Sequence, residues 1–152
     1  GGSKEIMDFL APNGPVYQAG TLSGNPIAMS AGYAMLNYLS SNKNIYKSLD
    51  KKTTYFKNGM KDIMNTTSIP FQINSLGSMI SLHFTEIPVT DFITAQKADN
   101  IHFKNYFHGM LSMGVYLPPS AYESYFLNDA LTNEDIDFTL EAFERVIKTL
   151  SS

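Results

Sequence analysis

Residues 17–29 read Y-Q-A-G-T-L-S-G-N-P-I-A-M, a glycine-rich turn that runs directly into an apolar segment. Asn25 is a favoured N-cap residue and Pro26 suits the first helical position, so the stretch predicts a helix that begins at Pro26. A helix N-terminus also presents unpaired N–H groups to anions. Gly20 allows close approach of the backbone, and the Thr21 hydroxyl can donate to a phosphate oxygen. Spacing alone favours a plain helix start but leaves an anion site open, although the G-x-x-x-x-G-K pattern of a nucleotide P-loop is missing.

Three helices are expected around this turn. Apolar residues at spacings of three and four carry the first helix from Pro26 to about Leu39. A polar break at residues 40–42 separates it from a second helix over about 43–65, which is amphipathic and has its apolar stripe at Ile45, Leu49, Phe56, Met60 and Ile63. Upstream of the turn, Ser3 can cap a short helix over Lys4 to Leu10.

Strands are expected in the middle of the chain. Residues 71–74 and 78–85 are rich in β-compatible side chains. A helical pattern then covers about 91–113, and Gly114 is well placed as the left-handed residue that ends it. Residues 115–117 resemble a short strand stopped by two prolines.

The C-terminal segment predicts one more helix and completes the expected fold. Thr132 and Asp135 have the spacing of a capping box, and the apolar residues that follow mark an amphipathic helix to Leu150. Acidic side chains at residues 134–137 favour a helix N-terminus and need no functional explanation. We therefore expect an α+β domain over about 43–152, a short sheet covered by helices. The first 42 residues do not obviously belong to it.

Composition excludes several classes of function. The 152 residues carry a net charge of −3, and Arg145 is the only arginine among 11 basic residues. The basic residues form no stripe, so nucleic-acid binding is not expected. The chain has no cysteine and no apolar run near the roughly 20 residues of a membrane span, so we expect an intracellular, cytoplasmic protein without membrane contact.

Histidines and one unusual loop are the other candidate sites. His83, His102 and His108 do not pair with carboxylates at metal-ligand spacing, so no metal site is expected. The loop P-P-S-A-Y-E-S-Y-F at 118–126 carries a single carboxylate, Glu123, among aromatic and hydroxyl side chains. Glu123 is either a solvated surface residue or part of a pocket wall that accepts hydrogen bonds from a polar ligand.

Five motifs in order resemble one enzyme family. They are G-P-V-Y-Q-A-G-T-L-S-G-N-P at 14–26, L-G-S-M at 76–79, P-V-T-D-F at 88–92, F-H-G-M-L-S-M-G-V-Y-L at 107–117 and E-D-I-D at 134–137. Together they resemble the C-terminal third of the glutamate-1-semialdehyde 2,1-aminomutase family, within the class III pyridoxal-phosphate-dependent aminotransferases. Aminotransferases acting on other amino acids commonly carry an arginine just before the matching prolines. Tyr116 and Leu117 stand there instead. Pro118 departs from the alanine that is common in relatives.

The resemblance implies a fold and a set of site residues. Residues 1–42 would be the tail of the large cofactor domain, and residues 43–152 the small C-terminal domain of a fold-type I enzyme. Gly20 and Thr21 would contact the phosphate of pyridoxal 5'-phosphate bound to the neighbouring subunit of a homodimer. Glu123 would be a catalytic-site residue that orients the small-molecule substrate.

The resemblance also implies an activity and a limit to it. The parent enzyme would convert glutamate-1-semialdehyde to 5-aminolevulinate in tetrapyrrole biosynthesis. The lysine that forms the Schiff base lies upstream of the matching segment in the family, so this chain alone is expected to be inactive and to bind the cofactor poorly. Two alternatives stay open: part of another class III ω-aminotransferase, or a non-catalytic interaction domain.

Overall fold

The computed structural model describes residues 1–151 of the 152-residue chain. Its internal contacts divide the chain into two units, Gly1–Lys43 and a second unit that begins at Asn44. The boundary lies one residue after the expected one, which separates residues 1–42 from 43–152. The assignment of the two parts to a large and a small domain of a parent enzyme stays a prediction.

The first unit contains two helices, α1 (Lys4–Met7) and α2 (Pro26–Ser41), and a parallel bridge between Leu10 and Val16. The expected helix to Leu10 is too long, since α1 ends at Met7 and the Ser3 side chain makes no capping hydrogen bond. The start of α2 at Pro26 is confirmed. No side chain of residues 1–43 is buried, although α2 is rich in apolar residues.

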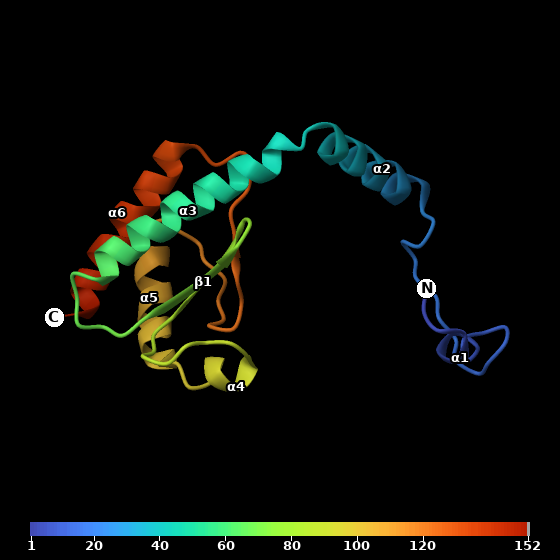
Figure 1. Ribbon diagram of the computed structural model, residues 1–152, viewed down its shortest axis with the longest axis horizontal. Coiled ribbons are helices and arrows are strands. Elements are labelled where there is room, and N and C mark those ends of the chain that lie inside the picture. Colours follow the sequence, from blue (N-terminus) through green and yellow to red (C-terminus); the bar gives the residue numbers. More distant parts are fainter. Residues whose placement is uncertain (152) are drawn as a thin grey trace. The chain divides into compact units, whose positions relative to one another are not determined.

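The second unit is an α+β fold, as expected. Its elements are α3 (Asn44–Met64), β1 (Gln72–Leu76), β2 (Met79–His83), α4 (Phe92–Ala95), α5 (Asn100–Ser112), β3 (Tyr125–Phe126) and α6 (Asn133–Leu150). The strands form an antiparallel sheet in the order β1-β2-β3. Gly77 has a φ of +57° in the tight turn between β1 and β2, a conformation that favours glycine. Figure 1 shows α3 and α6 side by side, with α5 against α6.

Two expectations for this unit are wrong. The helical stretch over 91–113 is two helices, because the Asp99 carboxylate accepts hydrogen bonds from the N–H groups of Ile101 and His102 and starts α5 anew. Residues 115–117 form no strand. The third strand is instead β3, where Phe126 pairs with Met79 and Tyr125 with Ile80.

One hydrophobic core holds the helices against the sheet. Among the side chains with no solvent exposure are Met60 from α3, Ile80 from β2, Tyr106 from α5 and Phe143 from α6. The rings of Tyr106 and Phe143 meet edge to face, with centroids 5.7 Å apart. Full burial of such side chains contributes about 1.5–3 kcal/mol each. None of the helices within residues 1–151 has both the length and the apolar character needed to cross a membrane.

Candidate functional site

Two successive turns, over residues 20–23 and 22–25, precede α2, and Gly20 and Thr21 belong to the first of them. The Ser23 N–H donates to the Gly20 carbonyl at 3.0 Å, and the Asn25 N–H donates to the Leu22 carbonyl at 3.2 Å. A side chain at position 20 would bring its Cβ to 2.7 Å from the Ser23 hydroxyl oxygen, closer than van der Waals contact allows. Because the exposed Ser23 side chain can rotate away, this contact favours glycine at position 20 but does not require it.

The exposed side of this turn carries hydrogen-bond donors. Within residues 1–151, the N–H groups of Thr21 and Leu22 and the Thr21 hydroxyl make no hydrogen bond, and both residues are exposed. Two backbone donors and one hydroxyl beside a glycine form a suitable set for a phosphate group. The residues present thus fit the cofactor phosphate that the family resemblance implies here.

The N-terminus of α2 itself does not supply those donors, which agrees with the plain capped helix start that spacing favours. The Asn25 side chain accepts from the N–H groups of Ile27 at 3.0 Å and Ala28 at 3.2 Å. The Met29 N–H donates to the Asn25 carbonyl, and Pro26 has no N–H. The capped helix end is satisfied, so hydrogen bonds to an anion come from the turn before it, while the helix dipole still favours negative charge.

Glu123 belongs to the second unit, at the end of a turn over residues 120–123. Its N–H donates to the Ser120 carbonyl at 3.1 Å, and the Tyr122 N–H donates to the Ser120 hydroxyl at 3.2 Å. Glu123 is exposed. The contact between Glu123 and the substrate, implied by the family resemblance, stays a prediction.

A pocket of about 440 Å³ lies beside the same loop. Apolar and aromatic side chains dominate its lining, which consists of Phe56, Val115, Tyr116, Leu117, Pro118, Ser124, Tyr125, Phe126, Leu127, Leu131, Asp135, Ile136 and Thr139. Glu123 is not among them. The pocket wall expected around Glu123 therefore includes its neighbour Ser124 and omits the carboxylate. Tyr125 lines this pocket, but its hydroxyl is buried, and that burial raises its pKa to about 12.

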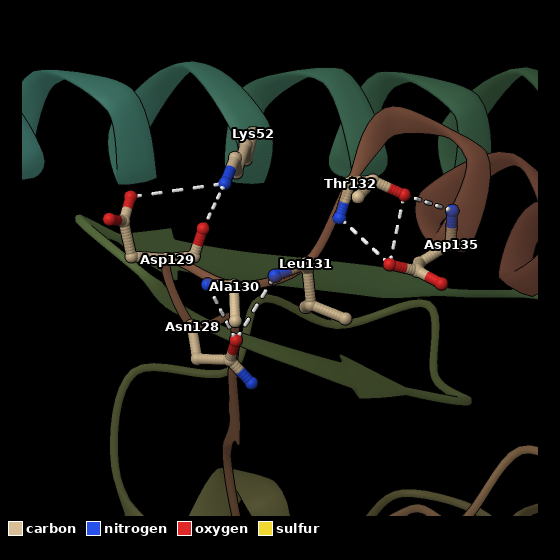
Figure 2. A network of polar contacts seen from close by, with 7 residues as sticks. All are labelled: Lys52, Asn128, Asp129, Ala130, Leu131, Thr132 and Asp135. Carbon is tan, nitrogen blue, oxygen red and sulfur yellow. Dashed lines mark hydrogen bonds and ion pairs between the residues drawn. The ribbon is translucent and has the colours of Figure 1, made fainter.

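Polar contacts hold the segment before α6 and the first turn of that helix (Figure 2), which contribute Leu131 and Asp135 to the pocket lining. Lys52 from α3 donates to the Asp129 carbonyl at 2.7 Å, and its Nζ lies 3.9 Å from the Asp129 carboxylate. The predicted capping box is confirmed: the Asp135 N–H donates to the Thr132 hydroxyl, and the Thr132 N–H donates to the Asp135 carboxylate at 2.8 Å. These bonds from Thr132 hold the pKa of Asp135 below its usual range.

Two of the three histidines occupy structural positions, whereas His108 is exposed on α5. His83 is buried in β2 with its Nε2 3.2 Å from the Ser81 hydroxyl, and burial lowers its pKa. His102 pairs with the Asp99 carboxylate at 2.8 Å, in the cap of α5. In the described residues 1–151, no three histidine, aspartate or glutamate side chains gather in a way that could hold a metal ion.

One contact of the Glu123 loop is invisible in the sequence. Asn100, the first residue of α5, donates from its side-chain amide to the Tyr122 hydroxyl at 3.2 Å. The two residues are 22 positions apart, and neither belongs to a motif that links them. Only the fold brings them together.

Comparison with known proteins decides the family. The aminotransferase class-III family matches residues 1–147, nearly the whole chain. The chain belongs to the class III aminotransferase family.

Curated members of this family are much longer than this chain. A glutamate-1-semialdehyde 2,1-aminomutase of Flavobacterium johnsoniae is 56% identical over 146 residues, which cover 96% of this chain and 34% of the relative. A protein of the same name from Desulfitobacterium hafniense is 47% identical over 150 residues, or 99% of this chain and 35% of the relative. The chain thus spans about a third of the length of the curated class III relatives it matches.

Solved transaminase structures support the fold. An ω-transaminase from Sphaerobacter thermophilus matches 97% of this chain and 34% of its own, with a TM-score of 0.74 and 19% identity. A transaminase with PLP bound matches 98% of this chain and 34% of its own, with a TM-score of 0.75 and 17% identity. At such identities the likeness concerns the fold alone.

Proposed function

We propose that this chain is the C-terminal third of a pyridoxal-phosphate-dependent glutamate-1-semialdehyde 2,1-aminomutase. The observation that carries the proposal is 56% identity to a curated aminomutase along 96% of the chain. The full-length enzyme would move an amino group between adjacent carbons and convert glutamate-1-semialdehyde to 5-aminolevulinate, the precursor of tetrapyrroles.

Residues of the first unit would bind the cofactor phosphate. The free N–H groups of Thr21 and Leu22 and the Thr21 hydroxyl would donate to it, and Gly20 would keep the approach open. When bound, pyridoxal phosphate supplies the electron sink for amino-group and proton transfer. By family resemblance the phosphate belongs to the other subunit of a homodimer. The exposed apolar side chains of α2 are consistent with a segment covered in a larger assembly.

Residues of the second unit would orient the substrate and determine which substrate is accepted. Glu123 would accept hydrogen bonds from polar groups of glutamate-1-semialdehyde. Tyr116 and Leu117 take the place of the arginine with which other class III enzymes grip a substrate carboxylate. This absence favours the aminomutase over a second candidate, an ω-aminotransferase that uses a separate amino acceptor.

Turnover by the full-length enzyme distinguishes the two. An aminomutase forms 5-aminolevulinate from glutamate-1-semialdehyde with no keto acid added, because the substrate both gives up and receives an amino group, so the enzyme is regenerated in each turnover. An ω-aminotransferase stops after one half-reaction until a keto acid is supplied. The 152-residue chain alone is expected to show neither activity, since the family's cofactor lysine is not among its residues.

A further inference from the structure

The loop that carries Glu123 is tied to the second unit on both sides of the carboxylate: Tyr125 is buried and pairs with β2, and Tyr122 contacts two helices. Within the turn 120–123, Ala121 packs against the hydrophobic core, and Tyr122 makes the side-chain contacts to α4 and α5. Its hydroxyl accepts a hydrogen bond from the Asn100 amide at 3.2 Å, and its ring packs on Phe92 with centroids 5.4 Å apart and planes at 58°. One hydrogen bond and one ring contact therefore join this turn to two different helices.

The two helices that receive Tyr122 are held firmly at the ends it contacts. Phe92 is the first residue of α4, whose N-cap Asp91 forms a capping box with Thr94. Asn100 is the first residue of α5, which the Asp99 carboxylate caps. Capping fixes the backbone of the first helical turn. Tyr122 thus rests on a platform whose position is set by hydrogen bonds independent of the loop.

Glu123 is the next residue in the chain after Tyr122. Its own N–H donates to Ser120, so the turn transmits the position of Tyr122 to the next residue. Tyr122 is 47% exposed, and its hydroxyl contributes nothing to the hydrophobic core. The contact therefore contributes little through burial, and its hydrogen bond and ring contact are what it adds to the loop.

We propose that Tyr122, through its hydrogen bond with Asn100 and its contact with Phe92, is a positioning residue that places the Glu123 carboxylate toward the substrate. This inference rests on the proposed function, in which Glu123 orients glutamate-1-semialdehyde. Tyr122 acts through Glu123 and does not itself touch the substrate.

The test is a double-mutant cycle in the full-length enzyme, with kcat and KM for glutamate-1-semialdehyde as readouts. Tyr122→Phe removes the hydroxyl that accepts from Asn100 and keeps the ring on Phe92. Asn100→Ala breaks the same hydrogen bond from the other side. Tyr46→Phe, at a 56% exposed tyrosine of α3, is the matched control. Glu123→Gln, alone and combined with Tyr122→Phe, completes the cycle.

Loss of a hydrogen bond that orients a substrate-binding group is expected to raise KM by roughly threefold to tenfold and leave kcat nearly unchanged. Tyr122→Phe and Asn100→Ala should both show this change, and Tyr46→Phe should not. Glu123→Gln should raise KM at least as much. Adding Tyr122→Phe to Glu123→Gln should change KM by less than about twofold, because the positioned group is already lost.

Three results would overturn the proposal, and each refutes a different part of it. If Glu123→Gln raises KM but the effect of Tyr122→Phe is absent or multiplies with it, Tyr122 does not act through Glu123. If 5-aminolevulinate forms at wild-type kcat and KM in Glu123→Gln, the aminomutase assignment stands while the roles of both residues fall. If the wild-type enzyme forms no 5-aminolevulinate, the proposed function itself is wrong and this inference fails with it.

Discussion

Replacing Gly109 with alanine tests how closely α5 and α6 pack. A Cβ at position 109 would lie 2.7 Å from Cγ1 and 3.1 Å from Cγ2 of Val146. Val146 is buried, and a β-branched side chain within a helix has one strongly preferred rotamer. It cannot turn away, so the two helices must separate or the core must strain.

The same change at Gly59 provides a matched control. There the Cβ would meet Leu140 at 2.5 Å from Cδ1 and 2.8 Å from Cδ2. Leu140 is only partly buried and has two side-chain torsions, so its methyl groups can swing aside. Both substitutions gain about 1 kcal/mol of helix propensity.

Overpacking costs about 1–3 kcal/mol. Because Val146 resists moving, we place Gly109→Ala in the upper part of this range, about 2–3 kcal/mol, so that after the gain of about 1 kcal/mol in helix propensity it loses about 1–2 kcal/mol of unfolding free energy. Gly59→Ala should stay within about 1 kcal/mol of the wild type. Urea unfolding of the 152-residue chain measures both, followed by the near-ultraviolet circular dichroism of the buried tyrosines. If Gly109→Ala is as stable as the wild type, or Gly59→Ala loses more than Gly109→Ala, the close-packed helix interface is described incorrectly.

Further predictions concern the α6 cap, its loop and the phosphate turn. Thr132→Ala should cost about 1 kcal/mol in the same urea assay because the N-cap hydroxyl is lost, and an unchanged midpoint would contradict this. The pKa of Asp135 is lowered in the folded state, so the stability that this carboxylate contributes is complete above its ordinary pKa of 3.8 and is lost as the pH falls through the folded pKa. Asp135→Asn should therefore make the free energy of unfolding fall less steeply at acidic pH, and the same acid dependence as in the wild type would refute this. Lys52→Ala should lower stability by about 1 kcal/mol by releasing Asp129, whereas an equal loss in Lys47→Ala, an exposed neighbour on α3, would point to general charge effects. In the full-length enzyme, Thr21→Val should weaken pyridoxal phosphate binding by roughly tenfold in absorbance titrations, and unchanged affinity would remove the hydroxyl from the phosphate site.

The parts of the fold that follow local rules are those that the sequence predicts well. Asn25 and Pro26 define the start of α2, and the Thr132 capping box defines the start of α6. Gly114 ends the helix before it with a φ of +85°. Each signal depends on hydrogen bonds and backbone angles within a few residues, so a single sequence is enough to locate it.

The parts that fail depend on distant partners. Tyr125 and Phe126 become a strand only because β2 pairs with them, whereas residues 115–117 have strand-like side chains and no partner. The break between α4 and α5 arises from the Asp99 cap inside a continuous apolar pattern.

The candidate site divides in the same way. The sequence predicts the glycine at position 20 and the capped helix after it. It does not predict which N–H groups stay free: the Asn25 side chain accepts from the first helical N–H groups, so the free donors belong to the turn. The hydrogen bond between Asn100 and Tyr122 leaves no trace in the sequence because it depends on how α5 meets the loop.

The central claim is that the full-length enzyme moves an amino group within one substrate pool. The most direct measurement supplies glutamate-1-semialdehyde labelled with nitrogen-15, unlabelled amino acids and no keto acid, and follows the label in the product. An aminomutase forms 5-aminolevulinate over many turnovers, and after the first turnover its nitrogen is labelled. Unlabelled 5-aminolevulinate, or a reaction that stops after one turnover until a keto acid is added, would contradict the account.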